Sequence, residues 1–279
     1  MHRPLFFLCT PGIVSELGDL VYLTTDADGE IHVYEDRRFR YLTFGNAVEQ
    51  SCFDPANPAQ LQHVYTQAMM LALLLHPEPR DVVLLGLGGG SLARAMRAAD
   101  RRLRILGVER RAAVIEVAKR YFDLPEGARF GVVCAEADVF LEGDSGGRDL
   151  ILADLYLAEG MHPRQLATDF LALCRARLSE SGVLVVNQWA SEYQRNRQAL
   201  GALHEVFEGR LIQLHVQGGN ILTFGFNGGL PTLRRDDFFA DAQALGLRLG
   251  VPLQRQARNL WRQNAEVLGV GRFRGHRLL

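Results

Sequence analysis

The hydrophobic pattern divides the chain into a first part of short strands and a second part in which strands and helices alternate. Four early segments are rich in β-branched and aromatic residues: LVYLTT (20–25), EIHVYE (30–35), FRYLTF (39–44) and AVEQSCF (47–53). The turn residues DADG (26–29) separate the first two segments. This pattern predicts a small antiparallel β unit.

A helix is predicted between the two parts. In LQHVYTQAMMLALLLH (61–76), apolar residues recur at the i, i+3, i+4 and i+7 spacing of a buried helical face. The prolines of HPEP (76–79) would end this helix, because proline lacks the amide hydrogen that a helix needs.

From residue 81 onward, strands and helices alternate. The predicted strands are VVLLGLG (82–88), LRILGVE (103–109), ARFGVVCA (128–135), RDLILADLY (148–156) and SGVLVVNQW (181–189). The predicted helices are SLARAMRAAD (91–100), RAAVIEVAKRYF (111–122), QLATDFLALCRARL (165–178) and a last one from PTLRRDDFFADAQALGLRLG (231–250) onward. Apolar strands alternating with helices indicate an α/β fold with a doubly wound, mostly parallel sheet. We therefore predict a β domain over residues 1–58 and an α/β domain over residues 59–279.

Composition limits the class of protein. With 279 residues, 48% of them hydrophobic, the chain can bury a large core, and its formal net charge of −1 gives no overall attraction to nucleic acid or to an anionic membrane. Arginines gather at 94–104 and 272–277, but no aromatic stacking motif accompanies them, so we interpret them as solvated faces.

No targeting segment or structural metal is expected. No apolar run reaches the roughly 20 residues of a membrane span, and Pro11 and Gly12 break the apolar start too early for a secretory signal. These features predict a cytoplasmic protein. The widely spaced cysteines suit reduced thiols rather than disulfides or a zinc site; they are Cys9, Cys52, Cys134 and Cys174.

The candidate chemistry begins at VVLLGLGGGSLARAM (82–96), where a strand meets a run of glycines: Gly86, Gly88, Gly89 and Gly90. In an open α/β sheet, ligands bind beyond the carboxyl ends of the strands, and glycines there let the backbone approach them closely. Such a turn could also be only a tight connection between strand and helix.

Acidic residues follow the next three strands. Glu109 ends the second strand, where a carboxylate can accept both hydroxyls of a ribose. Glu136 and Asp154 follow the third and fourth strands. Taken singly, Glu109 could be an acid at a helix start and Glu136 a solvated surface residue. Together with the glycines they predict a nucleoside site.

From roughly Val33 to Phe226 the chain resembles the spermidine synthase family of polyamine aminopropyltransferases, in a divergent bacterial branch. The resemblance rests on FGNAVEQS, YTQAMM, HPEP, LGLGGGSLAR, GVERRAAVIEVAKRYF, ILADLY and LATDFLALCRARLSESGVLVVNQW, in this order. It implies an N-terminal β domain and a class I S-adenosylmethionine-type Rossmann domain. It also implies a polyamine substrate and a homo-oligomer, since family members are usually dimers or tetramers; we expect a dimer. From the net charge and the absence of a long apolar run we expect no nucleic-acid or membrane partner.

The candidate site residues follow from the motifs and the resemblance together. The predicted co-substrate-binding residues are Gln50, Gly86, Gly88, Gly89, Gly90, Glu109, Glu136 and Asp154. The predicted acceptor-binding residues are Tyr65, Tyr156 and Gln188, and the predicted catalytic residue is Asp154, which matches the first Asp of the family's D-x-x-D motif.

The chain departs from the family pattern at three positions that should bind cationic amines. Gly89 replaces the Asp that would hold the amine of decarboxylated S-adenosylmethionine, and Gln67 replaces a Glu of the polyamine groove. Leu157 replaces the second Asp of D-x-x-D, which takes the proton of the attacking amine. An aliphatic amine with a pKa of about 10 cannot attack until a base deprotonates it, so Asp154, Tyr156 or another neighbour, such as Glu159 or Asp138, would have to act.

Three functions therefore stay open. The first is aminopropyl transfer from decarboxylated S-adenosylmethionine to a polyamine such as putrescine. The second is methyl transfer from intact S-adenosylmethionine, which Gly89 and Leu157 favour because they bear no charge. The third is nucleoside or polyamine binding without turnover.

Overall fold

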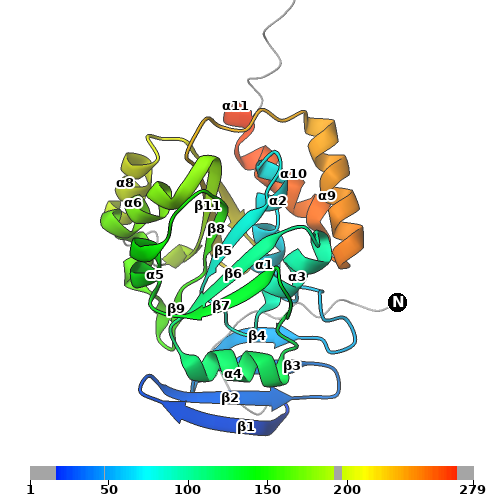
Figure 1. Ribbon diagram of the computed structural model, residues 1–279. Helices are drawn as coiled ribbons and strands as arrows, with labels where there is room; N and C mark the ends of the chain where they lie inside the picture. The colour runs from blue at the N-terminus through cyan, green and yellow to red at the C-terminus, as the bar shows by residue number, and fades with distance from the viewer. Residues whose placement is uncertain (1–16, 47, 192–196, 269–279) are drawn as a thin grey trace, which may run out of the picture.

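The structure is a computed structural model that describes residues 17–46, 48–191 and 197–268. Cys9, the apolar start of the chain and the arginines at 272–277 lie outside these ranges. In Figure 1, a small sheet lies below a larger central sheet that is flanked by helices. Among the described helices, none is both long and apolar enough to span a membrane.

The small sheet is an antiparallel meander, as predicted. Its strands are β1 (Asp19–Asp26), β2 (Gly29–Glu35), β3 (Arg40–Thr43) and β4 (Glu49–Phe53). Asp26 pairs with Gly29 across the first turn, where Gly29 adopts a φ of +107° that favours glycine. The Asp26 carboxylate accepts the N–H of Asp28 at 2.9 Å and stabilises this turn.

The central sheet has seven strands in the order β12-β13-β11-β8-β5-β6-β7. The parallel strands are β5 (Asp81–Leu85), β6 (Arg104–Glu109), β7 (Phe130–Cys134), β8 (Arg148–Ala153) and β11 (Leu178–Trp189). The predicted fold class is confirmed. The sequence analysis missed the antiparallel strands β12 (Leu211–Val216) and β13 (Asn220–Phe226) at one edge.

Helices cover both faces of the central sheet (Figure 1). One face carries α5 (Ala137–Gly143), α6 (Thr168–Arg177) and α8 (Arg197–Val206). The other carries α1 (Val64–Met69), α2 (Ala72–Leu75), α3 (Ser91–Ala99), α9 (Arg235–Leu249), α10 (Leu253–Gln263) and α11 (Ala265–Leu268). Successive side chains of a strand point to opposite faces, so Val82 and Leu84 join one core and Val83 and Leu85 the other.

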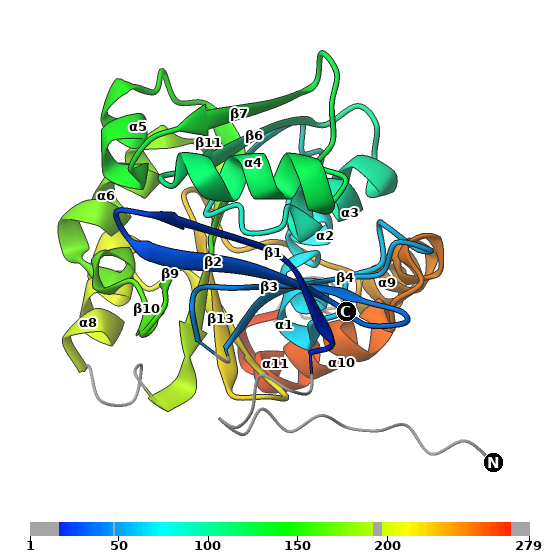
Figure 2. The ribbon, with the colours of Figure 1, turned by 90° about the horizontal axis from the view of Figure 1, so that it is seen from below.

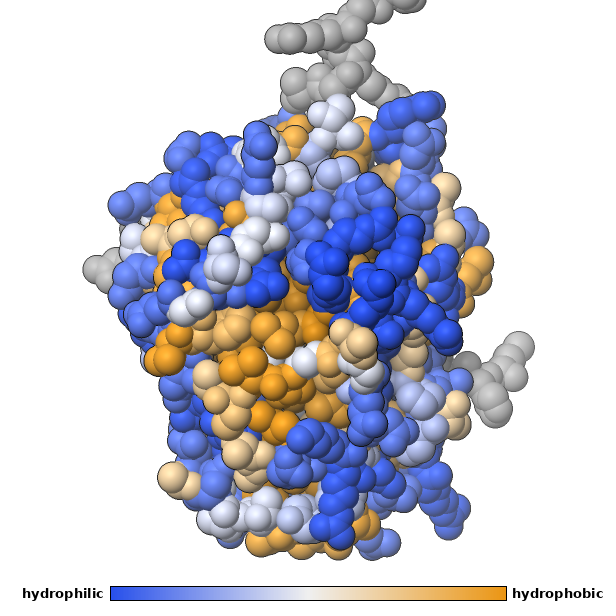
Figure 3. All heavy atoms as spheres, viewed as in Figure 1, coloured by the Kyte–Doolittle hydropathy of each residue, from blue (hydrophilic) through white to orange (hydrophobic). Residues whose placement is uncertain are grey.

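The edge strand β7 is less covered than the middle of the sheet. Four of its five residues are half-buried, and Cys134 is exposed. Figure 3 shows hydrophobic residues gathered in the middle of the face that it shares with Figure 1, and α4 (Ala112–Tyr121) follows β6 in the chain. Cys52, Cys134 and Cys174 are free thiols.

The helix α4 joins the two sheets. Its buried residues Val114 and Val117, with Phe122 just after it, share a core with Ile31 and Phe53 of the small sheet. Figure 2 shows α4 running alongside the small sheet. The small sheet is therefore held where β4 faces the carboxyl edge of the central sheet.

The segment predicted as one helix over 61–76 forms two short helices instead. Between α1 and α2 the N–H of Met70 donates to the carbonyl of Gln67 at 3.2 Å, and that of Leu71 to Ala68 at 3.1 Å. These i to i+3 bonds tighten the chain and interrupt the α-helix. The segment contacts β12, β13 and α10 and is buried on most sides, so tertiary contacts override its helical periodicity.

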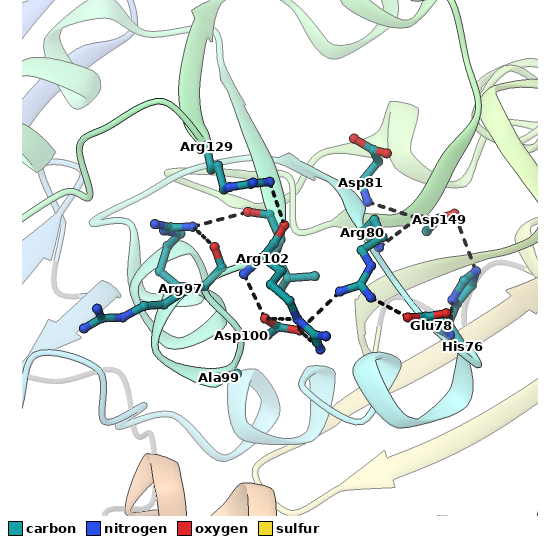
Figure 4. Close-up of polar contacts among 12 residues, drawn as sticks. His76, Glu78, Arg80, Asp81, Arg97, Ala99, Asp100, Arg102, Arg129 and Asp149 are labelled. Atoms are coloured by element: carbon teal, nitrogen blue, oxygen red, sulfur yellow. Dashed lines mark hydrogen bonds and ion pairs between the residues drawn. The ribbon is translucent and has the colours of Figure 1, made fainter.

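Ion pairs and backbone bonds hold the amino edge of the central sheet, on the side opposite the glycine turn (Figure 4). The Asp149 carboxylate accepts the N–H groups of Arg80 and Asp81 at 2.8 and 3.0 Å. Arg102 pairs with Asp100 at 2.8 Å, and this bond holds the pKa of Asp100 at about 2. Part of the arginine-rich stretch thus has acidic partners of its own.

Arg94 of α3 is a buried cation that joins three parts of the fold. Its guanidinium donates to the carbonyls of Gly89, Phe122 and Pro58, the last at 2.9 Å, and it lies 4.5 Å from the centre of the Phe53 ring. Burial lowers the pKa of Arg94 to about 10. The residue therefore ties the glycine turn to the end of α4 and to the loop after β4.

Replacing Arg94 should cost more stability than replacing a solvated arginine of the same stretch. Arg94→Met leaves three carbonyls without their donor, so the free energy of unfolding should fall by about 2–4 kcal/mol in urea denaturation. The exposed Arg101 offers a matched control, and Arg101→Met should change it by less than about 0.5 kcal/mol. Equal effects of the two substitutions would contradict the role given to Arg94.

Candidate active site

A cavity of about 1870 Å³ lies between the small sheet and the carboxyl edge of the central sheet. This volume exceeds the roughly 300–1000 Å³ of a site for one small ligand, so it has room for two substrates. The ends of five parallel strands, together with β4 and α1, supply its wall. Predicted residues in the lining are Gln50, Tyr65, Gly86, Gly88, Glu109, Glu136, Asp154 and Tyr156.

The glycine turn forms one side of the cavity. Gly86 and Gly88 adopt φ values of +90° and +51°, and a Cβ on Gly86 would collide with the carbonyl of Asp154. The turn can therefore pass this close to the end of β8 only with glycine at position 86.

Gly89 and Gly90 face the core beneath the turn. The N–H of Gly89 donates to Ser51 Oγ at 2.8 Å, and a Cβ on Gly89 would stand 3.0 Å from Phe122 Cδ1. Gly90, with a φ of +76°, abuts Leu124. The position where the family has an Asp is thus taken up by contacts between the two sheets.

The Glu109 carboxylate lies directly under the turn. Its two oxygens accept the N–H groups of Leu87 at 3.2 Å and Arg111 at 3.0 Å. Burial raises the pKa of Glu109 overall, although these bonds and the backbone N–H of Gly88 lower it. The half-exposed Glu136 lies farther along the same wall, 3.5 Å from the guanidinium of Arg110.

Asp154 ends β8 in the interior of the cavity. Its Oδ1 accepts the side-chain N–H of Asn187 at 2.8 Å, and its Oδ2 accepts the hydroxyl of Tyr65 at 3.4 Å. Burial raises the pKa of Asp154, and the bond from Asn187 and the nearby His63 oppose that rise. The carboxylate is thus held in one orientation.

The two polar residues at the end of β11 point to opposite faces. Asn187 lines the cavity, whereas the predicted site residue Gln188 is completely buried and accepts the hydroxyl of Thr223 at 2.8 Å. Asn187 was not among the predicted site residues, although successive side chains of a strand point to opposite faces, so that Asn187 and Gln188 cannot both face the cavity. Gln165 supports this region: its side chain accepts the N–H of Leu155 at 2.8 Å and donates to the carbonyl of Asn187 at 2.6 Å.

A short hairpin follows Asp154. It comprises β9 (Tyr156–Leu157) and β10 (Gly160–Met161), before a 3₁₀ turn at Pro163–Leu166. Asn46, after β3, donates to the carbonyl of Ala158 at 2.5 Å and so fixes the hairpin to the small sheet. The Tyr156 ring lies in the cavity wall, 5.4 Å from that of Trp189.

A carboxylate and a histidine that form a pair also face the cavity: Glu49 comes from the small sheet and His63 from the start of α1. His63 Nε2 lies 2.5 Å from Glu49 Oε1, and the His63 ring stacks on Tyr65 with 5.6 Å between centroids. Both residues were missed, because they are distant in sequence and belong to no short motif.

Most arginines of the cavity wall are paired with carboxylates, whereas Arg255 contacts the side chain of Gln217, at 3.5 Å. Arg111 lies 2.7 Å from Asp26 and Arg164 lies 2.5 Å from Asp138. Arg110, already near Glu136, lies 2.7 Å from Asp28. Of the described residues, no three His, Cys, Asp or Glu side chains gather as a metal site would need.

Comparison with known proteins finds similarity over most of the chain, although no family model matches. A polyamine aminopropyltransferase of Chromobacterium violaceum is 30% identical over 246 residues, which are 88% of this chain and 94% of the relative. One of Neisseria meningitidis is 29% identical over 84% of this chain and 90% of its own length. An eEF1A lysine and N-terminal methyltransferase homolog of Drosophila melanogaster is 30% identical over 52% of this chain and 24% of its own length.

Solved structures share the fold. A probable spermidine synthase of Corynebacterium glutamicum superposes with a TM-score of 0.69 at 19% identity, over 85% of this chain and 89% of its own. Human methyltransferase-like protein 13, in complex with SAH, superposes with a TM-score of 0.58 at 23% identity, over 68% of this chain and 94% of its own.

Removing the Glu109 carboxylate should weaken the binding of every adenosyl ligand alike. Glu109→Ala removes acceptors for two hydroxyl groups, so affinity measured by titration calorimetry should fall about 10- to 100-fold. The exposed Glu116 of α4 provides the control, and Glu116→Ala should leave affinity unchanged. Unchanged affinity in Glu109→Ala would mean that the adenosyl group binds elsewhere.

A carboxylate at position 89 should not fit the present turn. Gly89→Asp brings a Cβ against Phe122 and Ser51, so the free energy of unfolding should fall by about 1–3 kcal/mol. In a Phe122→Leu background the same change should cost less, since the ring contact is gone. If Gly89→Asp proves as stable as the parent protein, Phe122 does not limit this position.

Proposed function

Because the chain belongs to the polyamine aminopropyltransferase family, we propose that it transfers an aminopropyl group from decarboxylated S-adenosylmethionine to a polyamine such as putrescine. The observation that carries the proposal is the buried Asp154 carboxylate, held by Asn187 and Tyr65 in a cavity that also contains the glycine turn. A carboxylate held in one orientation beside a proposed nucleoside site is suited to binding a cationic amine as the second substrate.

Under this proposal the adenosyl group lies against the glycine turn, with its ribose on Glu109 and its base toward Glu136. The position of the Glu109 carboxylate in the cavity lining, beside the glycine turn, supports the ribose contact. The arginines Arg110, Arg111 and Arg164 already hold carboxylate partners, so the carboxylate of intact S-adenosylmethionine would compete with those acids. The bare aminopropyl chain of the decarboxylated form avoids this competition.

The chain's residues would act mainly by binding and orientation. Asp154 accepts an N–H of the acceptor amine and directs its lone pair at the methylene group next to the sulfonium sulfur. The new N–C bond forms as the C–S bond breaks, and the bond pair passes to sulfur, which leaves as a neutral thioether. Tyr65 and Asn187 keep the Asp154 carboxylate aligned during this step.

Methyl transfer from intact S-adenosylmethionine is the second candidate. The partial similarity to a methyltransferase homolog and the uncharged Gly89 and Leu157 favour it. The two activities differ in their products, so they can be separated in one assay. A methyltransferase would consume the intact sulfonium compound and release the demethylated thioether.

The proposal also includes a cytoplasmic location and a homodimer without nucleic-acid or membrane partners. The family resemblance supports both, and sedimentation of the full chain would test the dimer.

The parent protein should form spermidine and 5′-methylthioadenosine from putrescine and decarboxylated S-adenosylmethionine, as detected by chromatography. Asp154→Asn should lower kcat/KM for putrescine by about 10²-fold or more, because the amide cannot offer a charged acceptor. The exposed Asp241 of α9 gives the control, and Asp241→Asn should behave as the parent. Methylated product from the intact compound, with no spermidine, would favour methyl transfer instead.

A further inference from the structure

The proposed reaction needs a proton acceptor that the D-x-x-D pattern does not supply here. Leu157 cannot accept a proton, and the proposed reaction already assigns the Asp154 carboxylate to orienting the amine, by accepting one of its N–H groups. The cavity wall next to Asp154 must therefore contain another base if the attacking amine is to lose its proton inside the site.

Glu49 and His63 have the required arrangement. Glu49 comes from β4, and His63 lies at the N-cap of α1, where its carbonyl accepts the Thr66 hydroxyl at 2.8 Å. The Glu49 carboxylate lies 2.5 Å from His63 Nε2, and both side chains line the cavity. The ring stacks at an interplanar angle of 12° on Tyr65, which reaches Asp154.

This contact decides which ring nitrogen can act as a base. A carboxylate that accepts the Nε2–H of an imidazole fixes the tautomer in which Nδ1 carries the free lone pair. The same carboxylate stabilises the imidazolium that forms when Nδ1 takes a proton. Glu49 would thus act as a positioning residue for His63.

We propose that His63, oriented by Glu49, accepts the proton of the attacking amine in place of the carboxylate absent at Leu157. This inference rests on the proposed aminopropyl transfer. One proton moves from the protonated amine to His63 Nδ1, and the freed lone pair forms the N–C bond as the C–S bond breaks. The product keeps two hydrogens on its new secondary ammonium, and the proton on His63 passes to solvent.

Base strength favours imidazole over a carboxylate for this step. Proton transfer from an ammonium group with a pKa of about 10 to an imidazole with a pKa of about 6.5 is unfavourable by about 3.5 powers of ten. The same transfer to an ordinary Asp carboxylate is unfavourable by about six powers of ten. Burial lowers the pKa of His63, but the Glu49 bond and the charges of Glu49 and Asp154 outweigh it, so the pKa is raised overall. The facing hydroxyl of Tyr65 stays protonated, because burial and Asp154 raise its pKa.

The pH profile provides the first test. His63→Gln in the full chain should lower kcat about 10²- to 10⁴-fold and remove the inflection on the acidic side of the profile. In the parent, kcat should rise with pH through the raised pKa of His63, because only the neutral ring accepts a proton. Glu49→Gln should move this inflection to lower pH, because the carboxylate that raises the pKa is gone.

The chain offers a matched control pair. His32 and Glu30 form the same contact, with 2.9 Å between Nε2 and Oε2, on the small sheet outside the cavity. His32→Gln and Glu30→Gln should leave kcat and its pH profile as in the parent. Calorimetric binding of decarboxylated S-adenosylmethionine confirms that each variant is folded, and His63→Gln should bind it as the parent does.

An NMR titration of the His63 ring in the parent separates this inference from the proposed function. Putrescine bound beside the ring should lower the His63 pKa, since a second cation disfavours the imidazolium. A parent that forms no spermidine would overturn the proposed function and, with it, the role of His63, whereas the next two results, in a parent that forms spermidine, concern the role of the pair alone. An unchanged His63 titration with putrescine, or a His63→Gln variant with parental kcat and pH profile, would overturn the role of the pair.

Discussion

The contact between the glycine turn and the small sheet is the constraint on which the site depends. The N–H of Gly89 donates to Ser51 Oγ, while Arg94 donates to the carbonyls of Gly89 and Phe122. These bonds bring β4 to the carboxyl edge of the central sheet, so that Glu49 and Gln50 line the same cavity as Asp154. Without this contact, each sheet would carry only part of the site.

The same constraint accounts for one departure from the family pattern. A Cβ on Gly89 would stand 3.0 Å from Ser51 Cβ and Phe122 Cδ1, so a carboxylate at that position requires these neighbours to shift. Negative charge is instead found at Asp154 and at Glu49, which both line the cavity. The acidic groups that could bind an amine therefore come from both sheets: Asp154 from the central sheet and Glu49 from the small sheet.

The features that could be predicted from the sequence were those whose local sequence pattern agrees with the fold. The glycine turn, Glu109 and Asp154 could be predicted because carboxyl ends of parallel strands meet at one edge of a sheet. The pair of Glu49 and His63 could not, since 14 residues separate them and only the tertiary fold brings them together. The strands β12 and β13 escaped prediction because no alternation with helices marked them.

The central claim is that this cavity holds an adenosyl sulfonium compound whose aminopropyl end bears no carboxylate. Calorimetric binding of decarboxylated and intact S-adenosylmethionine to the parent protein, measured side by side, tests it most directly. The account predicts tighter binding of the decarboxylated form, because Arg110, Arg111 and Arg164 of the cavity wall already have acidic partners. Tighter binding of the intact form would contradict the account.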